Sequence, residues 1–198
     1  SRKITVTYEA GDSIDATPEA IEELQDKQFI MYVGRPTPHK NLERLIEAFA
    51  ILKEKHPELH LVLAGKTDRL FKRHSGTVEK RGLQDVHFTG FISDGQLRWL
   101  YEHCAAYVFP SLSEGFGLPG LEAMSHGAPV VSSNATCLPE VYGDAAHYFD
   151  PLDVEAIAKA INDVLTKPEL RKELVRAGTK QVGKYSWKRM AEQTLAVY

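Results

Sequence analysis

The sequence contains few cysteines, no long apolar run and no block of like charge. Its two cysteines, Cys104 and Cys137, both lie in apolar surroundings, which favours reduced thiols in a cytoplasmic protein over a disulfide framework. The apolar runs are too short for a helix that spans a membrane, and we find no signal-peptide pattern. With 24 basic and 27 acidic residues and no basic tract, the chain is not expected to bind nucleic acid.

The composition is that of an ordinary globular domain. The 198 residues are 43% hydrophobic and 26% charged, which suits one domain with a sizeable core. The eight histidines show no metal-ligand spacing, and His39 and His126 fit surface or packing roles better than ligation. We also find no Ser/His/Asp arrangement, no repeat and no low-complexity segment. We therefore expect neither a metal centre nor a catalytic triad.

Short apolar runs alternate with segments of helical periodicity along most of the chain. The runs predict strands at residues 3–8, 29–34, 59–65, 86–88, 106–109, 128–131 and 146–149. Helices are predicted at residues 18–27, 42–56, 69–81, 94–104, 119–126, 138–142, 154–165 and 168–178, and from Ser186 onward. This alternation is typical of α/β proteins, and it predicts a doubly wound parallel sheet of Rossmann-like type.

Polar residues mark the starts of several predicted helices. Asn41 and Asp153 each stand directly before an amphipathic segment, where a side-chain oxygen caps the first N–H groups. Ser93 and Gln96 have the spacing of a capping box. Gly127 suits the left-handed residue that ends a helix.

The stretch from residue 110 to 131, PSLSEGFGLPGLEAMSHGAPVV, reads as strand end, glycine-rich loop, helix and strand. A loop of this kind before a helix leaves backbone N–H groups at the positive end of the helix dipole, which favours phosphate. Glu114 lies at the loop mouth, and Glu122 lies about one turn into the helix on the same side as those N–H groups. Carboxylates do not bind phosphate but do bind hydroxyls, so the combination suggests a sugar nucleotide. Taken singly, the glycines fit turns and Glu122 fits the helix dipole without any ligand.

A second polar stretch follows the buried strand at residues 29–34. It reads G-R-P-T-P-H-K-N and places Arg35 and Lys40 at the carboxyl end of that strand. Open α/β sheets bind ligands at this edge, so the pair suggests a phosphate contact. The alternative interpretation is solvated surface charge, the commoner state of lysine and arginine.

Together these two stretches resemble a known family. E-G-F-G-L-P-G-L-E, from Glu114 to Glu122, resembles the EX7E motif of retaining glycosyltransferases of the GT-B fold, family 4. G-R-P-T-P-H-K-N resembles the G-R-x4-K segment of that family, and the resemblance runs from about Phe29 to the C-terminus. It implies that Arg35 and Lys40 hold the donor diphosphate, that Glu114 binds sugar hydroxyls and that Glu122 binds the ribose.

The resemblance also implies a wider donor site. Gly90-Phe91-Ile92 resembles the family's base-binding turn, where main-chain groups contact the nucleobase; a buried strand-to-helix turn is the alternative. The catalytic residues that it implies are Arg35, Lys40 and Glu114, and the donor-binding residues are Gly34, Phe91, Ile92, Gly115, Phe116, Gly117, Leu118 and Glu122. No metal and no cofactor beyond the donor substrate are expected.

The resemblance covers one half of a GT-B enzyme. It implies an interdomain-linker-like segment at residues 1–28 and a donor-binding domain at residues 29–198, with the N-terminal acceptor domain absent. We therefore expect little or no transferase activity from this chain alone. In the full enzyme, peripheral contact with the inner face of the membrane is expected, because relatives often act on lipid-linked acceptors.

The donor and the reaction are expectations of the same resemblance. L-V-L-A-G-K and S-E-G-F-G-L-P-G-L-E-A-M look most like bacterial mannosyltransferases of surface polysaccharide synthesis. GDP-mannose is the leading donor and UDP-glucose or another UDP-sugar is next, with a glycan or a lipid-linked acceptor. Two other functions stay open: a non-catalytic nucleotide-binding or regulatory module of the same fold, and a sugar-nucleotide epimerase.

Overall fold

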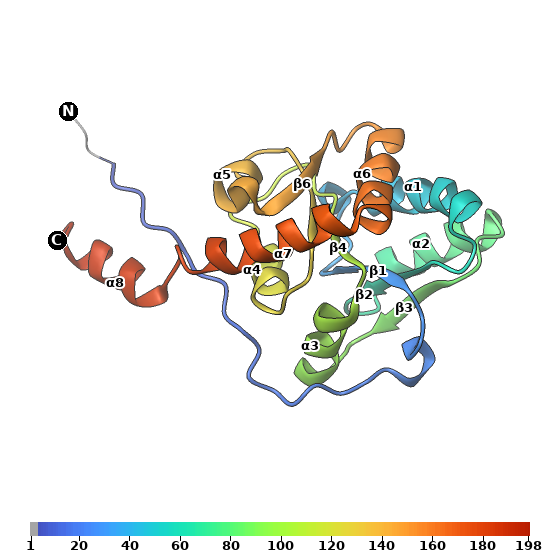
Figure 1. Ribbon diagram of the computed structural model, residues 1–198, viewed down its shortest axis with the longest axis horizontal. Coiled ribbons are helices and arrows are strands. Elements are labelled where there is room, and N and C mark those ends of the chain that lie inside the picture. The colour runs from blue at the N-terminus through green and yellow to red at the C-terminus, as the bar shows by residue number, and fades with distance from the viewer. Residues whose placement is uncertain (1–3) are drawn as a thin grey trace.

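A parallel sheet forms the centre of the protein (Figure 1). The computed structural model describes residues 4–198, except for the side chain of Leu70. Within these residues six strands pair in parallel in the order β3-β2-β1-β4-β5-β6. The strands are β1 Phe29–Val33, β2 His60–Ala64, β3 Val86–Gly90, β4 Ala106–Phe109, β5 Val130–Ser133 and β6 Ala146–Phe149. The predicted doubly wound α/β fold is confirmed.

Helices connect the strands and cover the sheet. They are α1 Leu42–Lys55, α2 Arg69–Lys80, α3 Asp94–His103, α4 Leu118–Ser125, α5 Leu138–Tyr142, α6 Val154–Thr166, α7 Pro168–Val182 and α8 Trp187–Leu195. Short 3-10 turns occur at Glu22–Leu24, Pro38–Lys40 and Gly143–Ala145. Strands β1, β2, β4 and β5 are almost entirely buried, as expected for a parallel sheet with helices on both faces. Among the described residues, no helix has the length and hydropathy to cross a membrane.

The strand order reverses between β1 and β4. These two strands are neighbours, with Ile30 opposite Ala106 and Met31 opposite Tyr107. Chain connections leave in opposite directions from such a pair, and this opens a crevice beyond the carboxyl ends of the two strands. The loops that follow them, residues 34–41 and 110–117, are the two polar stretches found in the sequence.

Most predicted helix ends are confirmed. Ser93 and Gln96 form both bonds of the capping box, and the Asp153 side chain accepts from the Ala156 N–H. Gly127 has a φ of 76° after α4. Helix α7 continues beyond Gly178 to Val182, because Gly178 packs closely against Met124 instead of ending the helix.

The strand predicted at residues 3–8 was wrong. Lys3 lies outside the described residues, and residues 4–10 form no strand. Their alternating pattern has no neighbouring strand to pair with, so Ile4 and Val6 stay 85% and 63% exposed. The helix predicted at 18–27 is reduced to the 3-10 turn Glu22–Leu24. The strand predicted at 128–131 begins at Val130, after a proline that has no N–H to donate.

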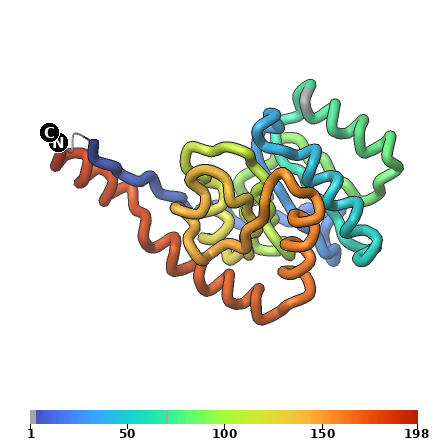
Figure 2. The backbone as a smooth tube through the Cα atoms, turned by 90° about the horizontal axis from the view of Figure 1, so that it is seen from above, coloured from blue at the N-terminus to red at the C-terminus, as the bar shows by residue number. Residues whose placement is uncertain are grey.

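The two ends of the described chain extend away from the sheet together. Figures 1 and 2 both show the N-terminal segment running beside α8. The Trp187 indole N–H donates to Asp12 at 2.8 Å, which joins the two segments. Helix α8 has no buried residue.

Candidate functional site

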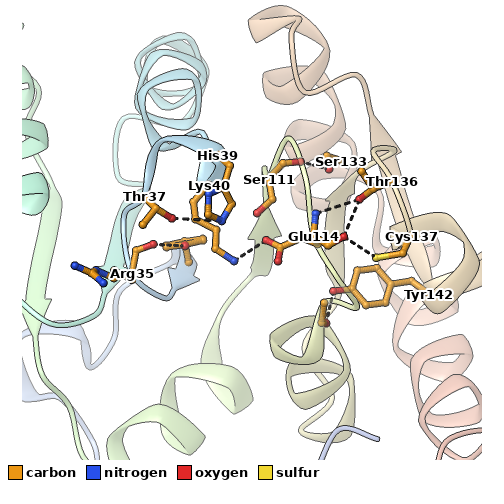
Figure 3. Close-up of polar contacts among 12 residues, drawn as sticks. Arg35, Thr37, His39, Lys40, Ser111, Glu114, Ser133, Thr136, Cys137 and Tyr142 are labelled. Carbon is orange, nitrogen blue, oxygen red and sulfur yellow. Dashed lines mark hydrogen bonds and ion pairs between the residues drawn. The ribbon is translucent and has the colours of Figure 1, made fainter. Parts of the chain in front are cut away.

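One ion pair joins the two sequence motifs (Figure 3). Lys40 ends the 3-10 turn after β1, Glu114 lies in the loop after β4, and Lys40 Nζ is 2.6 Å from Glu114 Oε1. The two side chains are only 19% and 11% exposed. Lys40 Nζ also lies 5.4 Å from the centre of the Phe109 ring. Partly buried charges need such compensation, so each group satisfies the other in the free protein.

The backbone of Glu114 is held by a third loop, between β5 and α5. The Glu114 N–H donates to Thr136 Oγ1 at 3.1 Å, and the Cys137 thiol donates to the Glu114 carbonyl at 3.4 Å. Thr136 adopts a left-handed conformation with a φ of 51°. Neither residue was predicted for the site. The available signal was positional, because residues 134–137 also follow a parallel strand at this edge of the sheet.

Asn41 ties the loops together instead of capping α1. Its φ is 59°, and its side chain makes no capping bond. The buried amide Nδ2 donates to the carbonyls of Pro110 and Pro151 at 3.1 and 2.8 Å, while Oδ1 accepts from Arg44 at 2.9 Å. Asn41 does stand at the N-cap position of α1, but the predicted capping hydrogen bond from its side chain was wrong. The side chain instead joins two loop backbones and the Arg44 side chain, because the folded structure places buried carbonyls within its reach.

The glycine-rich loop is shaped against Tyr142 of α5. Gly117 has a φ of 95°, and its carbonyl accepts from the Tyr142 hydroxyl at 2.5 Å. A Cβ at Gly117 would lie 2.7 Å from Leu138, and a Cβ at Gly120 would overlap the Tyr142 hydroxyl. These glycines let the chain turn tightly into α4, which begins at Leu118 with Pro119 in its first turn. The first turn of such a helix presents N–H groups without intrahelical partners.

Arg35 does not join the Lys40–Glu114 pair. Its side chain is 75% exposed, and its Nε lies 3.5 Å from a carboxylate oxygen of Asp68. Figure 3 shows the guanidinium directed away from Lys40 and Glu114. Gly34, directly before it, has a φ of 143° and donates its N–H to the Ala64 carbonyl at 3.0 Å. The structure thus brings Lys40 to Glu114 and leaves Arg35 on the β2 side of the crevice.

Glu122 contacts a different set of residues from Glu114. The Tyr101 hydroxyl donates to Glu122 Oε2 at 3.4 Å. Burial raises the pKa of the Glu122 carboxyl, and the nearby charges of Asp12 and Asp94 raise it further. Glu122 lines a cavity of about 460 Å³ whose other walls include residues 13–16 of the N-terminal segment and Asp94. The two carboxylates of the motif therefore have different partners: Glu114 pairs with Lys40, and Glu122 accepts from Tyr101.

The turn after β3 is exposed. Gly90 has a φ of 71°, and its carbonyl accepts from the Gly65 N–H at 3.2 Å. Phe91 is 87% exposed, so the alternative of a buried turn was wrong for this side chain. Phe91 and Ile92 line a groove of about 770 Å³ along β3.

Comparison with known proteins identifies the family. The profile of "Glycosyl transferases group 1" matches residues 13–181. The chain belongs to this family. The resemblance based on the two motifs is thereby confirmed, and the glycosyl transferase group 1 domain accounts for most of the chain.

Several curated relatives of this glycosyl transferase domain are mannosyltransferases. The serotype-specific mannosyltransferase WbdA of Escherichia coli is 40% identical over 183 residues, which cover 88% of this chain and 22% of WbdA. O-antigen chain mannosyltransferase B of Escherichia coli is 36% identical over 202 residues, covering 96% of this chain and 52% of the relative. The chain thus spans about a fifth to a half of the length of these relatives.

A solved structure shows the same fold. Sucrose-phosphate synthase from Thermosynechococcus elongatus superposes with a TM-score of 0.81 at 29% identity. The match covers 96% of this chain and 50% of that enzyme. The glycosyl transferase domain therefore corresponds to one half of a GT-B enzyme.

Proposed function

We propose that this chain is the donor-binding domain of a retaining, metal-independent glycosyltransferase of polysaccharide synthesis. It moves mannose from a nucleoside diphosphate sugar to a glycan or lipid-linked acceptor. GDP-mannose is the first candidate donor and a UDP-sugar such as UDP-glucose is the second. The observation that carries the proposal is the Lys40–Glu114 ion pair at the point where the strand order reverses. The mannosyltransferase relatives support the choice of sugar.

In this proposal the bound donor separates Lys40 from Glu114 and gives each of them a new partner. Lys40 turns from Glu114 to the diphosphate, and the released Glu114 carboxylate accepts hydrogen bonds from sugar hydroxyls. The exchange keeps both partly buried charges compensated, so neither side chain is left unpaired in the complex. The thiol and hydroxyl of the third loop hold the Glu114 backbone during the exchange.

The leaving diphosphate is stabilised by groups that are fixed in advance. The backbone N–H groups at Phe116 to Leu118 face the β-phosphate at the start of α4, where the helix dipole favours negative charge. Negative charge on this phosphate grows as the bond to the sugar breaks, so such donors stabilise the transition state more than the ground state. Arg35 joins them only after leaving Asp68, which its 75% exposed side chain is free to do.

The nucleoside part of the donor lies toward α3 and β3. Glu122 accepts from the ribose hydroxyls, and main-chain groups at Phe91 and Ile92 contact the base. Residues 1–28 act as a linker to an acceptor domain, and the donor-binding domain alone has little transferase activity. The full enzyme works in the cytoplasm, at the inner face of the membrane when its acceptor is lipid-linked.

Calorimetric titration tests this function. GDP, UDP, ADP, GDP-mannose and UDP-glucose are titrated into the wild-type chain, Lys40→Ala and Glu114→Ala. Lys40→Ala is expected to weaken nucleoside diphosphate binding about 10- to 100-fold, the effect of a lost charged hydrogen bond. Glu114→Ala is expected to keep GDP or UDP binding and to lose the extra affinity of the sugar form. Lys53→Ala removes a lysine paired with Asp85 at 2.7 Å outside the site, and it serves as the control.

The same titration, together with assays of sugar conversion and sugar transfer, separates the competing functions. A non-catalytic nucleotide module binds the nucleotide but shows no sugar-dependent gain and ignores Glu114→Ala. An epimerase converts the nucleotide sugar itself once a two-domain protein is supplied, without any acceptor. If each ligand binds wild type and Lys40→Ala with the same affinity, the proposed diphosphate site is contradicted. Measurable sugar transfer by this chain alone contradicts the proposal that the donor-binding domain has little activity by itself.

A further inference from the structure

Three aromatic rings from distant parts of the chain meet beside the glycine-rich loop. Tyr8 belongs to the N-terminal segment, Phe116 to the loop itself and Tyr185 to the turn after α7. The ring centres are 6.1 Å apart for Tyr8 and Phe116, 5.9 Å for Tyr8 and Tyr185, and 5.5 Å for Phe116 and Tyr185. Two of the pairs are edge-to-face, a favourable geometry for aromatic rings at these distances.

Both tyrosines are anchored to α5 by their hydroxyls. Tyr8 donates to Glu140 Oε1 at 2.5 Å, and Tyr185 donates to the Val141 carbonyl at 2.8 Å. The hydrogen bond to Glu140 raises the pKa of Tyr8. The loop that leads into α5 is the one whose Thr136 holds the Glu114 backbone. The aromatic cluster and the Glu114 backbone are thus both held by α5 and the loop before it.

Phe116 is the residue of the glycine-rich loop whose side chain packs against the two anchored tyrosines. It lies between Gly115 and Gly117, two residues with unusual backbone freedom. Gly115 is exposed, and a Cβ there would have no neighbour within 4 Å. The backbone is bound on either side, at Glu114 by Thr136 and at Gly117 by Tyr142. The conformation between these two points therefore depends on where the Phe116 ring is packed.

We propose that Tyr8 is a positioning residue for the donor, because its ring holds Phe116 and so fixes the N–H groups of residues 116–118. This inference rests on the proposed function, in which those N–H groups contact the donor phosphate. Tyr8 itself does not touch the donor. Its segment runs beside α8, away from the sheet, so a movement of that segment changes the loop and thereby the donor affinity (Figure 2).

The test uses two readouts on the full chain, one of which needs no ligand. Amide hydrogen exchange of residues 113–118 is measured in the free protein, and GDP and UDP affinities are measured by calorimetry. Tyr8→Ala is expected to speed exchange in the loop and to weaken nucleotide binding about three- to tenfold, the range of one or two lost ring contacts. Tyr8→Phe keeps the ring and is expected to restore both values to within about twofold of wild type. Ile4→Ala alters an 85% exposed side chain of the same segment and is the matched control.

Each outcome decides the inference. Unchanged loop exchange in Tyr8→Ala overturns it, and so does a Tyr8→Phe variant that behaves like Tyr8→Ala, since ring packing would then not be the cause. Faster exchange in Tyr8→Ala with rescue by Tyr8→Phe supports the loop contact even if wild type binds no nucleotide, in which case the proposed function fails separately. Thermal unfolding checks each variant, and Tyr8→Leu, which keeps apolar volume without a ring, replaces any Tyr8→Ala that does not fold.

Discussion

The Lys40–Glu114 pair makes a quantitative prediction about the stability of the free protein. Removing either side chain leaves the other as a mostly buried charge without its partner, whereas removing both leaves no unpaired charge. Lys40→Ala and Glu114→Ala are therefore each expected to lower the free energy of unfolding, and the double variant is expected to lose less than the sum. The difference is the coupling energy of the pair.

The magnitude follows from the geometry. At the observed separation of 2.6 Å, two unit charges attract by about 1.6 kcal/mol in a medium like water and by about 6 kcal/mol at an effective dielectric constant near 20. The side chains are 19% and 11% exposed, so the pair lies between these limits, and desolvation offsets part of the attraction. We expect a coupling energy of about 2 kcal/mol.

Urea unfolding at pH 7 of the wild type, the two single variants and the double variant measures this value. Lys172 and Glu169 provide a matched control, since they pair at 2.8 Å with side chains that are 73% and 86% exposed. Their coupling energy is expected to stay below about 0.5 kcal/mol. Equal coupling in the two pairs would refute the reasoning, because burial would then not determine the strength of the site pair.

Three further predictions concern packing, helix propensity and pH. Gly120→Ala places a methyl group on the Tyr142 hydroxyl and is expected to lower the free energy of unfolding by about 1–3 kcal/mol. Gly76→Ala, at a helical site with no neighbour within 4 Å, is expected to raise it by about 0.5–1 kcal/mol. Burial lowers the pKa of His126, whose Nε2 accepts from the Ile14 N–H at 2.9 Å, so stability falls as pH drops below 6.5 toward the folded-state pKa.

Thermal and urea unfolding at pH 7.5 and pH 5.5 check these values. The sign for His126 follows because the unfolded chain binds the proton more readily, so acid favours unfolding. His126→Gln removes this group and is expected to reduce the loss of stability on acidification. It does not abolish the loss, because burial also lowers the pKa values of His60 and His74. An identical pH dependence in wild type and variant contradicts the role of His126, and a neutral Gly120→Ala contradicts the packing argument.

The sheet and most helices were predictable because their signals are local. A buried parallel strand such as Phe29–Val33 is an unbroken apolar run, and helix starts such as Ser93 and Asp153 carry their caps within three residues. The same kind of pattern gave a wrong strand at the N-terminus, where residues 4–10 form none. Alternation at residues 4–8 describes a chain that fits a sheet edge, but whether an edge is available there depends on the whole sheet.

The residue types of the candidate site could be predicted from the sequence, but most of the contacts between them could not. The basic segment and the EX7E-like segment carry the charges and glycines of a phosphate and hydroxyl site in consecutive residues. Asn41 bonds to Pro110 and Pro151, and Thr136 holds Glu114, through contacts between loops far apart in sequence. No local pattern contains that information, because each bond depends on where another loop's backbone lies.

The sequence by itself determined the alternation of strands and helices, the glycine-rich turn into α4 and the two charged motifs of the glycosyl transferase family. Those features depend on side-chain periodicity and backbone freedom, which act between near neighbours in the chain. Only the tertiary structure decided that Lys40 pairs with Glu114, 74 residues away, while Arg35 turns to Asp68. The physical reason is the strand order, which places β4 next to β1 and so brings their carboxyl-end loops into contact.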